Sequence, residues 1–131
     1  MKAREVYERA LALLSEHESD GANYDTAAFE ENAPRLLSLL CVMLDETDLT
    51  VRHKEFREEA AEIKTVTTLD DEVYLHPLIC AGVLPLGLAF LLIAEENSTL
   101  SSLFFSLYQK EKDALIRRFR KARRHQITSV Y

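Results

Sequence analysis

The histidines and carboxylates are the residues of this chain that could bind a metal ion or transfer protons. Four histidines are scattered along the sequence: His17, His53, His76 and His125. None has the spacing of a His-Glu-x-x-His motif, so we interpret them as surface or capping histidines. The acidic run 70–72 could hold a cation, but consecutive carboxylates ahead of a helix more often cap it and favour its positive end, and we prefer that interpretation. We expect neither a metal nor a cofactor.

Hydroxyl and thiol groups are the remaining candidates for nucleophilic chemistry. No His/Asp framework for a catalytic triad accompanies three serines near the start of the last predicted helix, Ser101, Ser102 and Ser106. The three glycines match neither a phosphate-binding loop nor a dinucleotide fingerprint. Cys41 and Cys80 lie in apolar stretches, which predicts buried free thiols rather than a disulfide or a metal site. We therefore expect that the chain is not an enzyme.

A basic run near the C-terminus is the feature that could contact an anionic partner. Residues 109–125 carry a net charge of +6 and the rest of the chain carries −12, which gives −6 in total. The candidate contacts for a partner or a nucleic acid are Arg117, Arg118, Arg120, Lys121, Arg123 and Arg124. They could meet phosphates, form a solvated helix end, or contact the acidic body of a neighbouring copy. The acidic remainder argues against tight binding to free DNA.

The spacing of apolar residues predicts the elements that carry these side chains. Steps of three and four residues predict a helix over residues 2–17. A second helix begins after Asp25, whose side chain can cap it. Pro34 either kinks this helix or lies in the first turn of one that begins near Asn32. Because residues 36–44 are apolar almost all round, we expect the second helix to be central.

The longest apolar stretch predicts a core helix over residues 77–95. Gly82, Pro85 and Gly87 weaken an isolated helix, which indicates a kink and a close helix–helix approach. The uncharged part of this stretch, 78–94, is 17 residues long, at the lower limit for crossing a membrane. Acidic residues flank it and no basic anchor is near, so we expect no membrane insertion.

The rest of the chain completes an all-α prediction. Residues 45–68 form either a short surface helix or a mobile loop. Residues 97–99 cap a last helix, and the alternation in residues 126–131 predicts an extended tail. With 131 residues and few glycines or prolines, we expect one domain, 1–131, of four to five helices around the central apolar helix. The charged N-terminal segment has no signal-peptide core, which favours an intracellular protein.

Several short patterns occur in an order that is similar to a known family. They are Tyr24-Asp25 before a Leu-rich helix, LDDEVYL at 69–75, LPLGLA at 84–89, LFFSLY at 103–108 and ITSVY at 127–131. The chain thereby resembles the small helical head–tail connector (adaptor) proteins of tailed bacteriophages and prophages, which often read Leu-Pro-Tyr-Gly-Leu-Ala and end in Ile-x-Asp-Val-Tyr. Leu86 and Ser129 depart from these patterns.

The resemblance implies a structural function without chemistry. Copies would form a homo-oligomeric ring on the portal, extend the DNA channel and meet other neck or tail proteins, in the bacterial cytoplasm during assembly and then in the virion neck. Contact with packaged DNA stays open. The docking tail would use Ile127, Val130 and Tyr131, which pair with a neighbour or the portal. The alternative is a small intracellular helical regulatory or DNA-associated protein that uses the basic last helix.

Overall fold

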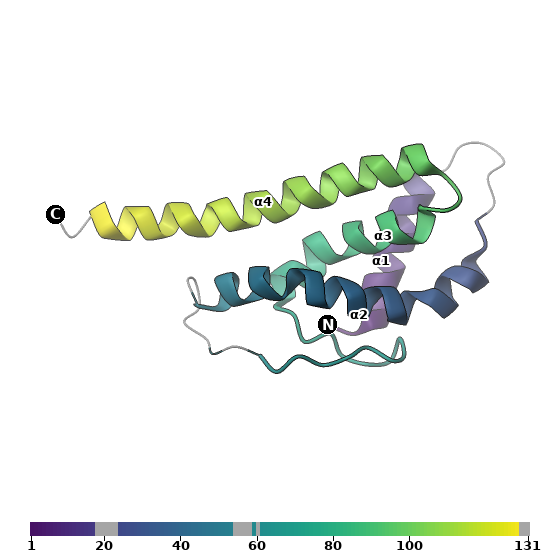
Figure 1. Ribbon diagram of the computed structural model, residues 1–131, viewed down its shortest axis with the longest axis horizontal. Coiled ribbons are helices and arrows are strands. Elements are labelled where there is room, and N and C mark those ends of the chain that lie inside the picture. The colour runs from purple at the N-terminus through teal and green to yellow at the C-terminus, as the bar shows by residue number, and fades with distance from the viewer. Residues whose placement is uncertain (18–23, 54–58, 60, 129–131) are drawn as a thin grey trace.

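Helices make up most of the chain (Figure 1). The computed structural model describes residues 1–17, 24–53, 59 and 61–128, with backbone only for 119–128. The elements are α1 (Ala3–Glu16), α2 (Thr26–Val51), the π-helical turn η2 (Ile79–Val83), α3 (Leu84–Ile93) and α4 (Ser98–Thr128). Within these described residues, β-pairing is confined to one isolated antiparallel bridge between Lys2 and Glu72. The all-α prediction is confirmed.

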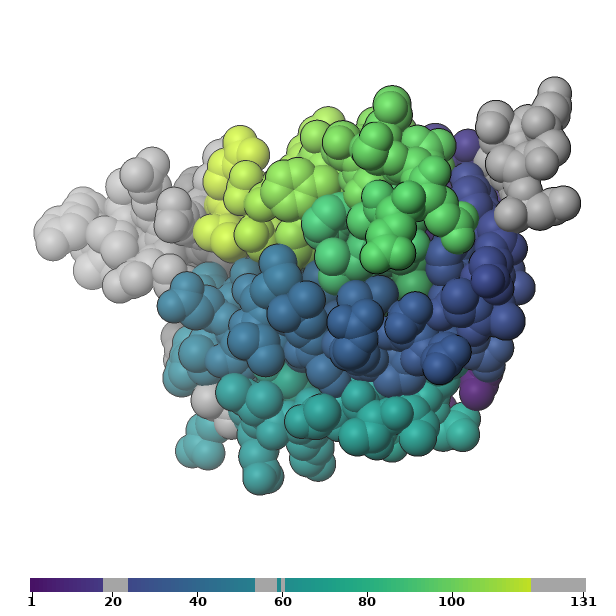
Figure 2. Space-filling model, turned by 45° about the vertical axis from the view of Figure 1, so that its right-hand side comes forward, coloured from purple at the N-terminus to yellow at the C-terminus, as the bar shows by residue number. Residues whose placement is uncertain are grey.

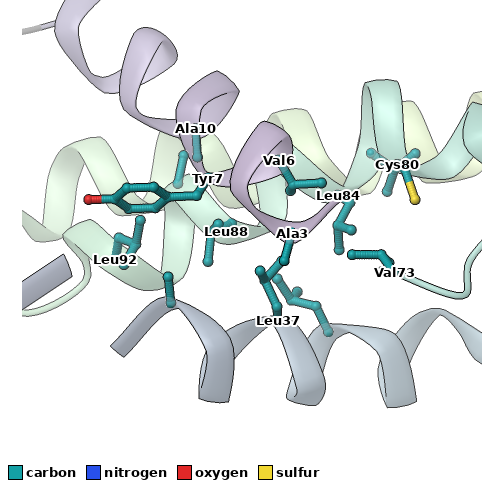
Figure 3. Close-up of a cluster of buried hydrophobic side chains, with 14 of the residues drawn as sticks. Ala3, Val6, Tyr7, Ala10, Leu37, Val73, Cys80, Leu84, Leu88 and Leu92 are labelled. Carbon is teal, nitrogen blue, oxygen red and sulfur yellow. The ribbon is translucent and has the colours of Figure 1, made fainter. Parts of the chain in front are cut away.

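The short helix α3 forms the centre of the fold. Its ten residues, LPLGLAFLLI, include no polar side chain, so every side of the helix needs an apolar neighbour. α1, α2 and α4 all pack against it. In Figure 3, Val6 and Tyr7 of α1 lie on the side of α3 that carries Leu88, and Leu37 of α2 approaches from another side. The central position predicted for the apolar helix is thus correct.

α2 lies at the surface, and the expectation that it is central is wrong. One stripe of the helix is buried, but Leu39, Val42 and Met43 are 48%, 67% and 48% exposed. Figure 2 shows α2 as an outer layer beside α4. The physical reason is that α2 carries polar groups around its other sides, for example Arg35 and Asp45. These groups reach water only if part of the helix stays exposed.

Gly87 provides the predicted close approach between helices. A Cβ atom placed there would lie 2.9 Å from Cδ2 of Leu40 in α2 and 3.1 Å from ring atoms of Tyr108 in α4. Both neighbours are fully buried. Gly82 is different, because a Cβ atom there would meet no atom within 4 Å. The two glycines of the apolar stretch therefore have separate roles.

The irregular turn η2 follows from Pro85. Proline has no backbone N–H, so the carbonyl of Ala81 loses its ordinary helical donor. Upstream of the proline the helix widens, and the N–H of Leu84 bonds to the carbonyl of Ile79, five residues back. The guanidinium Nη1 of Arg9, on α1, donates to the Ala81 carbonyl at 3.2 Å. The sequence predicts a kink at this place, and the structure has a π-helical turn whose Ala81 carbonyl accepts from a side chain of α1.

Residues 61–76 run without helix along one side of α2 (Figure 1). The hydroxyl of Ser38 accepts from the N–H of Val66 and donates to its carbonyl, both at 2.9 Å. Residues 45–51 belong to α2 and residues 61–67 are not helical, so a separate surface helix is not found there; residues 54–58 and 60 lie outside the described residues. Thus the segment follows α2 instead of forming a helix of its own.

The acidic run 70–72 is hydrogen-bonded to the start of the chain. The N–H of Ala3 donates to the carbonyl of Asp71 at 2.9 Å. The carboxylate of Asp71 accepts from the N–H groups of Thr67 and Thr68 at 2.8 and 3.0 Å. These hydrogen bonds lower the pKa of Asp71 below its ordinary value. The Asp71 carboxylate therefore caps a turn within residues 67–71 and not the following helix, which the acidic run was predicted to cap.

The helix caps follow the sequence, but the predicted tail boundary does not. Asp25 accepts from the N–H of Ala28 at 3.1 Å, and Asn97 accepts from that of Leu100 at 3.0 Å. Pro34 lies inside α2. α4 continues to Thr128, so residues 126–128 are helical and not extended; residues 129–131 lie outside the described residues. No glycine or proline interrupts this helix, which outweighs a short alternation of apolar and polar residues.

We expect Gly87→Ala to lower the free energy of unfolding by about 1–3 kcal/mol, because the added methyl group overpacks the contact with Leu40 and Tyr108. Gly82→Ala is the matched control, since its methyl group meets open space and a helical alanine gains up to about 1 kcal/mol over glycine. Urea unfolding followed by circular dichroism measures both variants. Equal stability of the two would contradict the close approach at Gly87.

Candidate interaction surfaces

The C-terminal part of α4 projects beyond the rest of the molecule. α3 is joined to α4 by residues 94–97, and the two helices pack against each other. At 1.5 Å per residue, the 31 residues of α4 span about 46 Å, whereas the helical stretch 77–93 that lies against it spans about 26 Å. The two lengths differ by about 20 Å. In Figure 1, α4 extends past the other helices towards the C-terminus.

Burial along α4 agrees with this overhang. Leu100, Phe104 and Tyr108 are buried, and Leu107 and Leu115 are half-buried, so one apolar stripe of the helix faces the body. Phe119 and Ala122 follow at the same spacing in the sequence, and their side chains lie outside the described residues. From Arg117 onward, the helix therefore lies beyond the body against which its first half packs.

The predicted basic contacts lie on the projecting part of α4. Arg117 and Arg118 are exposed, and the Nε of Arg117 donates to the carbonyl of Asp113 at 3.4 Å. The backbone places the other candidates on the same helix, although their side chains are not described: Arg120, Lys121, Arg123 and Arg124. Ile127 also falls within the helix, whereas Val130 and Tyr131 lie outside the described residues. We define residues 115–128 as the basic arm.

A groove between α1, η2 and α4, to which Pro85 and Leu86 at the start of α3 also contribute, was not predicted from the sequence. It has a volume of about 410 Å³. Its apolar lining comes from Ala12, Leu13, Ala81, Gly82, Pro85, Leu86 and Leu107, and its charged residues are Arg9, Glu16 and Glu111. The space exists because small residues face it and because Gly82 has no side chain to fill it. The groove forms only when α1 and α4 come together in the folded protein. In the sequence, the small side chains of the lining residues were the only sign of it.

A second apolar surface lies on the outer side of α2. Leu39, Val42 and Met43 follow one another at helical spacing and are exposed. The sequence contains this apolar stretch, which predicts a place in the core. Periodicity alone does not tell which of two apolar helices is surrounded by the others.

A buried carboxylate anchors the beginning of the central helix. Asp48 on α2 is 1% exposed, and its Oδ1 accepts from the backbone N–H of His76 at 2.6 Å. Its Oδ2 accepts from Nε of Arg52 at 2.8 Å, and Nη2 of the same arginine donates to the carbonyl of Tyr74 at 2.9 Å. The Tyr74 hydroxyl donates to Asp45 at 2.9 Å. These hydrogen bonds hold residues 74–76 to α2, which gives Asp48 a structural role.

Two of the histidines and two of the serines also bond within the protein. His17 and His76 contact backbone groups near helix ends, at 3.1 Å from the carbonyl of Leu13 and 3.2 Å from the N–H of Leu78. Ser101 donates to the carbonyl of Phe90 and Ser102 to that of Ser98. Within the described part of the chain, no group of three potential metal-binding side chains occurs.

The cysteines are buried and unpaired, as predicted. Burial raises the pKa of the Cys41 thiol to about 12 and that of the Cys80 thiol to about 11. Because the thiolate is the reactive form, both groups are poor nucleophiles near neutral pH.

None of the described helices combines the length and the apolar character needed to cross a membrane. No protein-family model, curated protein or solved structure matches the chain. The projecting basic arm, the groove and the exposed apolar surface of α2 are surfaces that could contact other molecules.

We expect Asp48→Ala to lower the free energy of unfolding by about 2–4 kcal/mol, because it removes the acceptor of the buried His76 N–H and of Arg52. Glu46→Ala is the matched control, because Glu46 is an exposed carboxylate on the same helix and its loss changes stability by less than about 0.5 kcal/mol. Thermal and urea unfolding measure both. If the two variants were equally stable, the anchoring role of Asp48 would be wrong.

Proposed function

We propose that this chain is a structural connector subunit of a phage or prophage neck, which assembles as a ring on the portal. The observation that carries the proposal is the basic arm, which extends about 20 Å past the body that α4 packs against. A helix that continues beyond its own domain leaves backbone and side chains for contact with other molecules. The sequence patterns that resemble head–tail connectors point to the same function.

The charge distribution supports contact between unlike surfaces. Residues 109–125 carry +6 and the remainder carries −12. Opposite charges favour a head-to-tail arrangement, in which the basic end of one copy faces the acidic body of the next, and like charges disfavour the head-to-head arrangement. Head-to-tail contacts generate rings when the rotation between copies closes. A ring around a DNA channel has this kind of contact.

Ile127, Val130 and Tyr131 are the proposed docking residues at the C-terminal end. In the proposed neck, they contact the portal or a neighbouring copy through apolar side chains. Ile127 is helical in the free chain, so backbone pairing of this residue with a partner requires the last turn of α4 to open. The end turn of a helix frays at little cost, because its last carbonyl groups lack helical partners.

We expect the protein to form a large complex with a portal protein from the same genetic element, and removal of residues 126–131 to abolish it. Multi-angle light scattering of each protein alone and of their mixture measures the masses. The matched control is Thr128→Ala/Ser129→Ala, which keeps the chain length and the apolar residues Ile127, Val130 and Tyr131. A portal complex that survives the truncation would overturn the docking role of the tail. Absence of any complex would overturn the neck function.

A DNA-associated regulatory protein is the second candidate, favoured by the exposure of Arg117 and Arg118 on the projecting helix. Basic side chains that neutralise phosphates release counterions, so the affinity falls steeply with salt. For this function, we expect Arg117→Gln/Arg118→Gln to reduce the slope of log affinity against log salt by up to about 1.8.

Fluorescence anisotropy with a labelled duplex over a salt series measures that slope. Arg35→Gln/Lys64→Gln is the matched control, because both residues are exposed and lie outside α4. The DNA-associated function predicts a smaller slope for the arm variant only. An affinity that does not depend on these arginines, or no binding at low salt, would exclude it.

A further inference from the structure

The groove between α1, η2 and α4 is suited to an apolar, basic segment. Its floor is formed by small and aliphatic residues, of which Leu13, Leu86 and Leu107 are half-buried and so still offer apolar surface. Two exposed carboxylates, Glu16 and Glu111, lie at the groove. The one cation there, Arg9, already donates to the Ala81 carbonyl. An occupant with apolar side chains and positive charges complements this lining.

The basic arm of α4 has this composition. Leu115 and Ile116 are half-buried at the point where the arm leaves the body, followed by the exposed Arg117 and Arg118. The spacing of Leu115, Phe119 and Ala122 continues the apolar stripe of the helix. The other six positions from 117 to 124 carry basic residues: Arg117, Arg118, Arg120, Lys121, Arg123 and Arg124. A helix whose sequence combines an apolar stripe with many cations therefore continues past the other helices.

The arm cannot reach the groove of its own chain. Leu107 and Glu111, which line the groove, belong to the same helix as the arm, and α4 is one continuous helix through Thr128. The arm lies farther along that axis and points away from the groove. An arm in the groove must then come from another copy, and each copy has one groove and one arm to offer.

We propose that the groove between α1, η2 and α4 receives the basic arm of a second copy of this chain. The apolar stripe of the arm lies on Leu13, Leu86 and Leu107, and its cations lie near Glu16 and Glu111. The two surfaces are different, so the contact is heterologous and leaves one free arm and one free groove at the ends of every open assembly. This contact is the one that joins neighbouring copies in the proposed connector. It rests on the connector function only for the closure of the assembly into a ring.

Two variants test the contact, one on each surface. Gly82→Arg places a long cation in the groove and disturbs no core contact, because a Cβ atom at Gly82 meets open space; Gly82→Ala is its control. Arg117→Glu/Arg118→Glu reverses the charge of the arm, and Arg35→Glu/Lys64→Glu makes the same change in net charge elsewhere. Circular dichroism and thermal unfolding check that each variant folds. If Gly82→Arg unfolds, Ala12→Arg, at an exposed groove position, replaces it.

Sedimentation velocity over a concentration series gives the expected result. The wild type self-associates more weakly as salt increases, and each test variant weakens its association by at least about tenfold, whereas the controls do not. An equimolar mixture of the groove variant and the arm variant restores a dimer and nothing larger, because one protein supplies the intact arm and the other the intact groove. A wild type that stays monomeric, test variants that associate normally, or a mixture without a dimer would each overturn the proposal.

Portal binding by the wild type and by Gly82→Arg distinguishes a failure of the groove contact from a failure of the connector function. If Gly82→Arg assembles on the portal as the wild type does, the groove contact is wrong and the neck function stands. If wild-type copies associate through the groove but never bind the portal, the contact stands and the neck function is wrong.

Discussion

The enclosure of α3 is the constraint on which the rest of the fold depends. A helix without polar side chains is stable in water only when other elements cover it on every side. α1, α2 and α4 provide that cover, and Gly87 lets α2 and α4 come close enough to close it. The same packing buries the Tyr108 hydroxyl, which has no hydrogen-bond partner among the described residues. Leaving a buried polar atom unpaired destabilises the folded state, so this hydroxyl is a cost of the close packing.

The polar groups of the interior hold the non-helical chain to this helical core. Asp48 fixes the approach to η2 through the N–H of His76, and Ser38 pairs with both backbone groups of Val66. Asp71 orders the turn that bonds to the start of α1. Residues 61–76 thus form no helix, and individual hydrogen bonds with side chains of α2 hold them in place. The side chains of Asp48, Ser38 and Asp71 therefore have structural contacts within the protein.

Charge and shape divide the molecule into a body and an arm. The body presents a groove with small residues over η2, and the arm continues the apolar stripe of α4 beyond the last helix that could cover it. Pro85 helps to form the groove. The π-helical turn that it causes is bonded to Arg9 and lines the groove together with Pro85 itself. The exposed Leu39, Val42 and Met43 on α2 add a second surface on which no occupant is indicated.

Local sequence determined the elements, and tertiary packing determined what they enclose. Periodicity, the caps at Asp25 and Asn97 and the lack of glycine and proline after residue 98 were sufficient for an all-α fold and for the basic helix. They were not sufficient to choose between α2 and α3 as the central helix, because both contain apolar runs and only the competition for the interior decides which is surrounded. The continuation of α4 through Thr128 was missed because a short alternating pattern is weak beside the propagation of a long helix. The groove depends on residues of α1, η2 and α4 that are far apart in the sequence, so it exists only once the three elements have packed around α3.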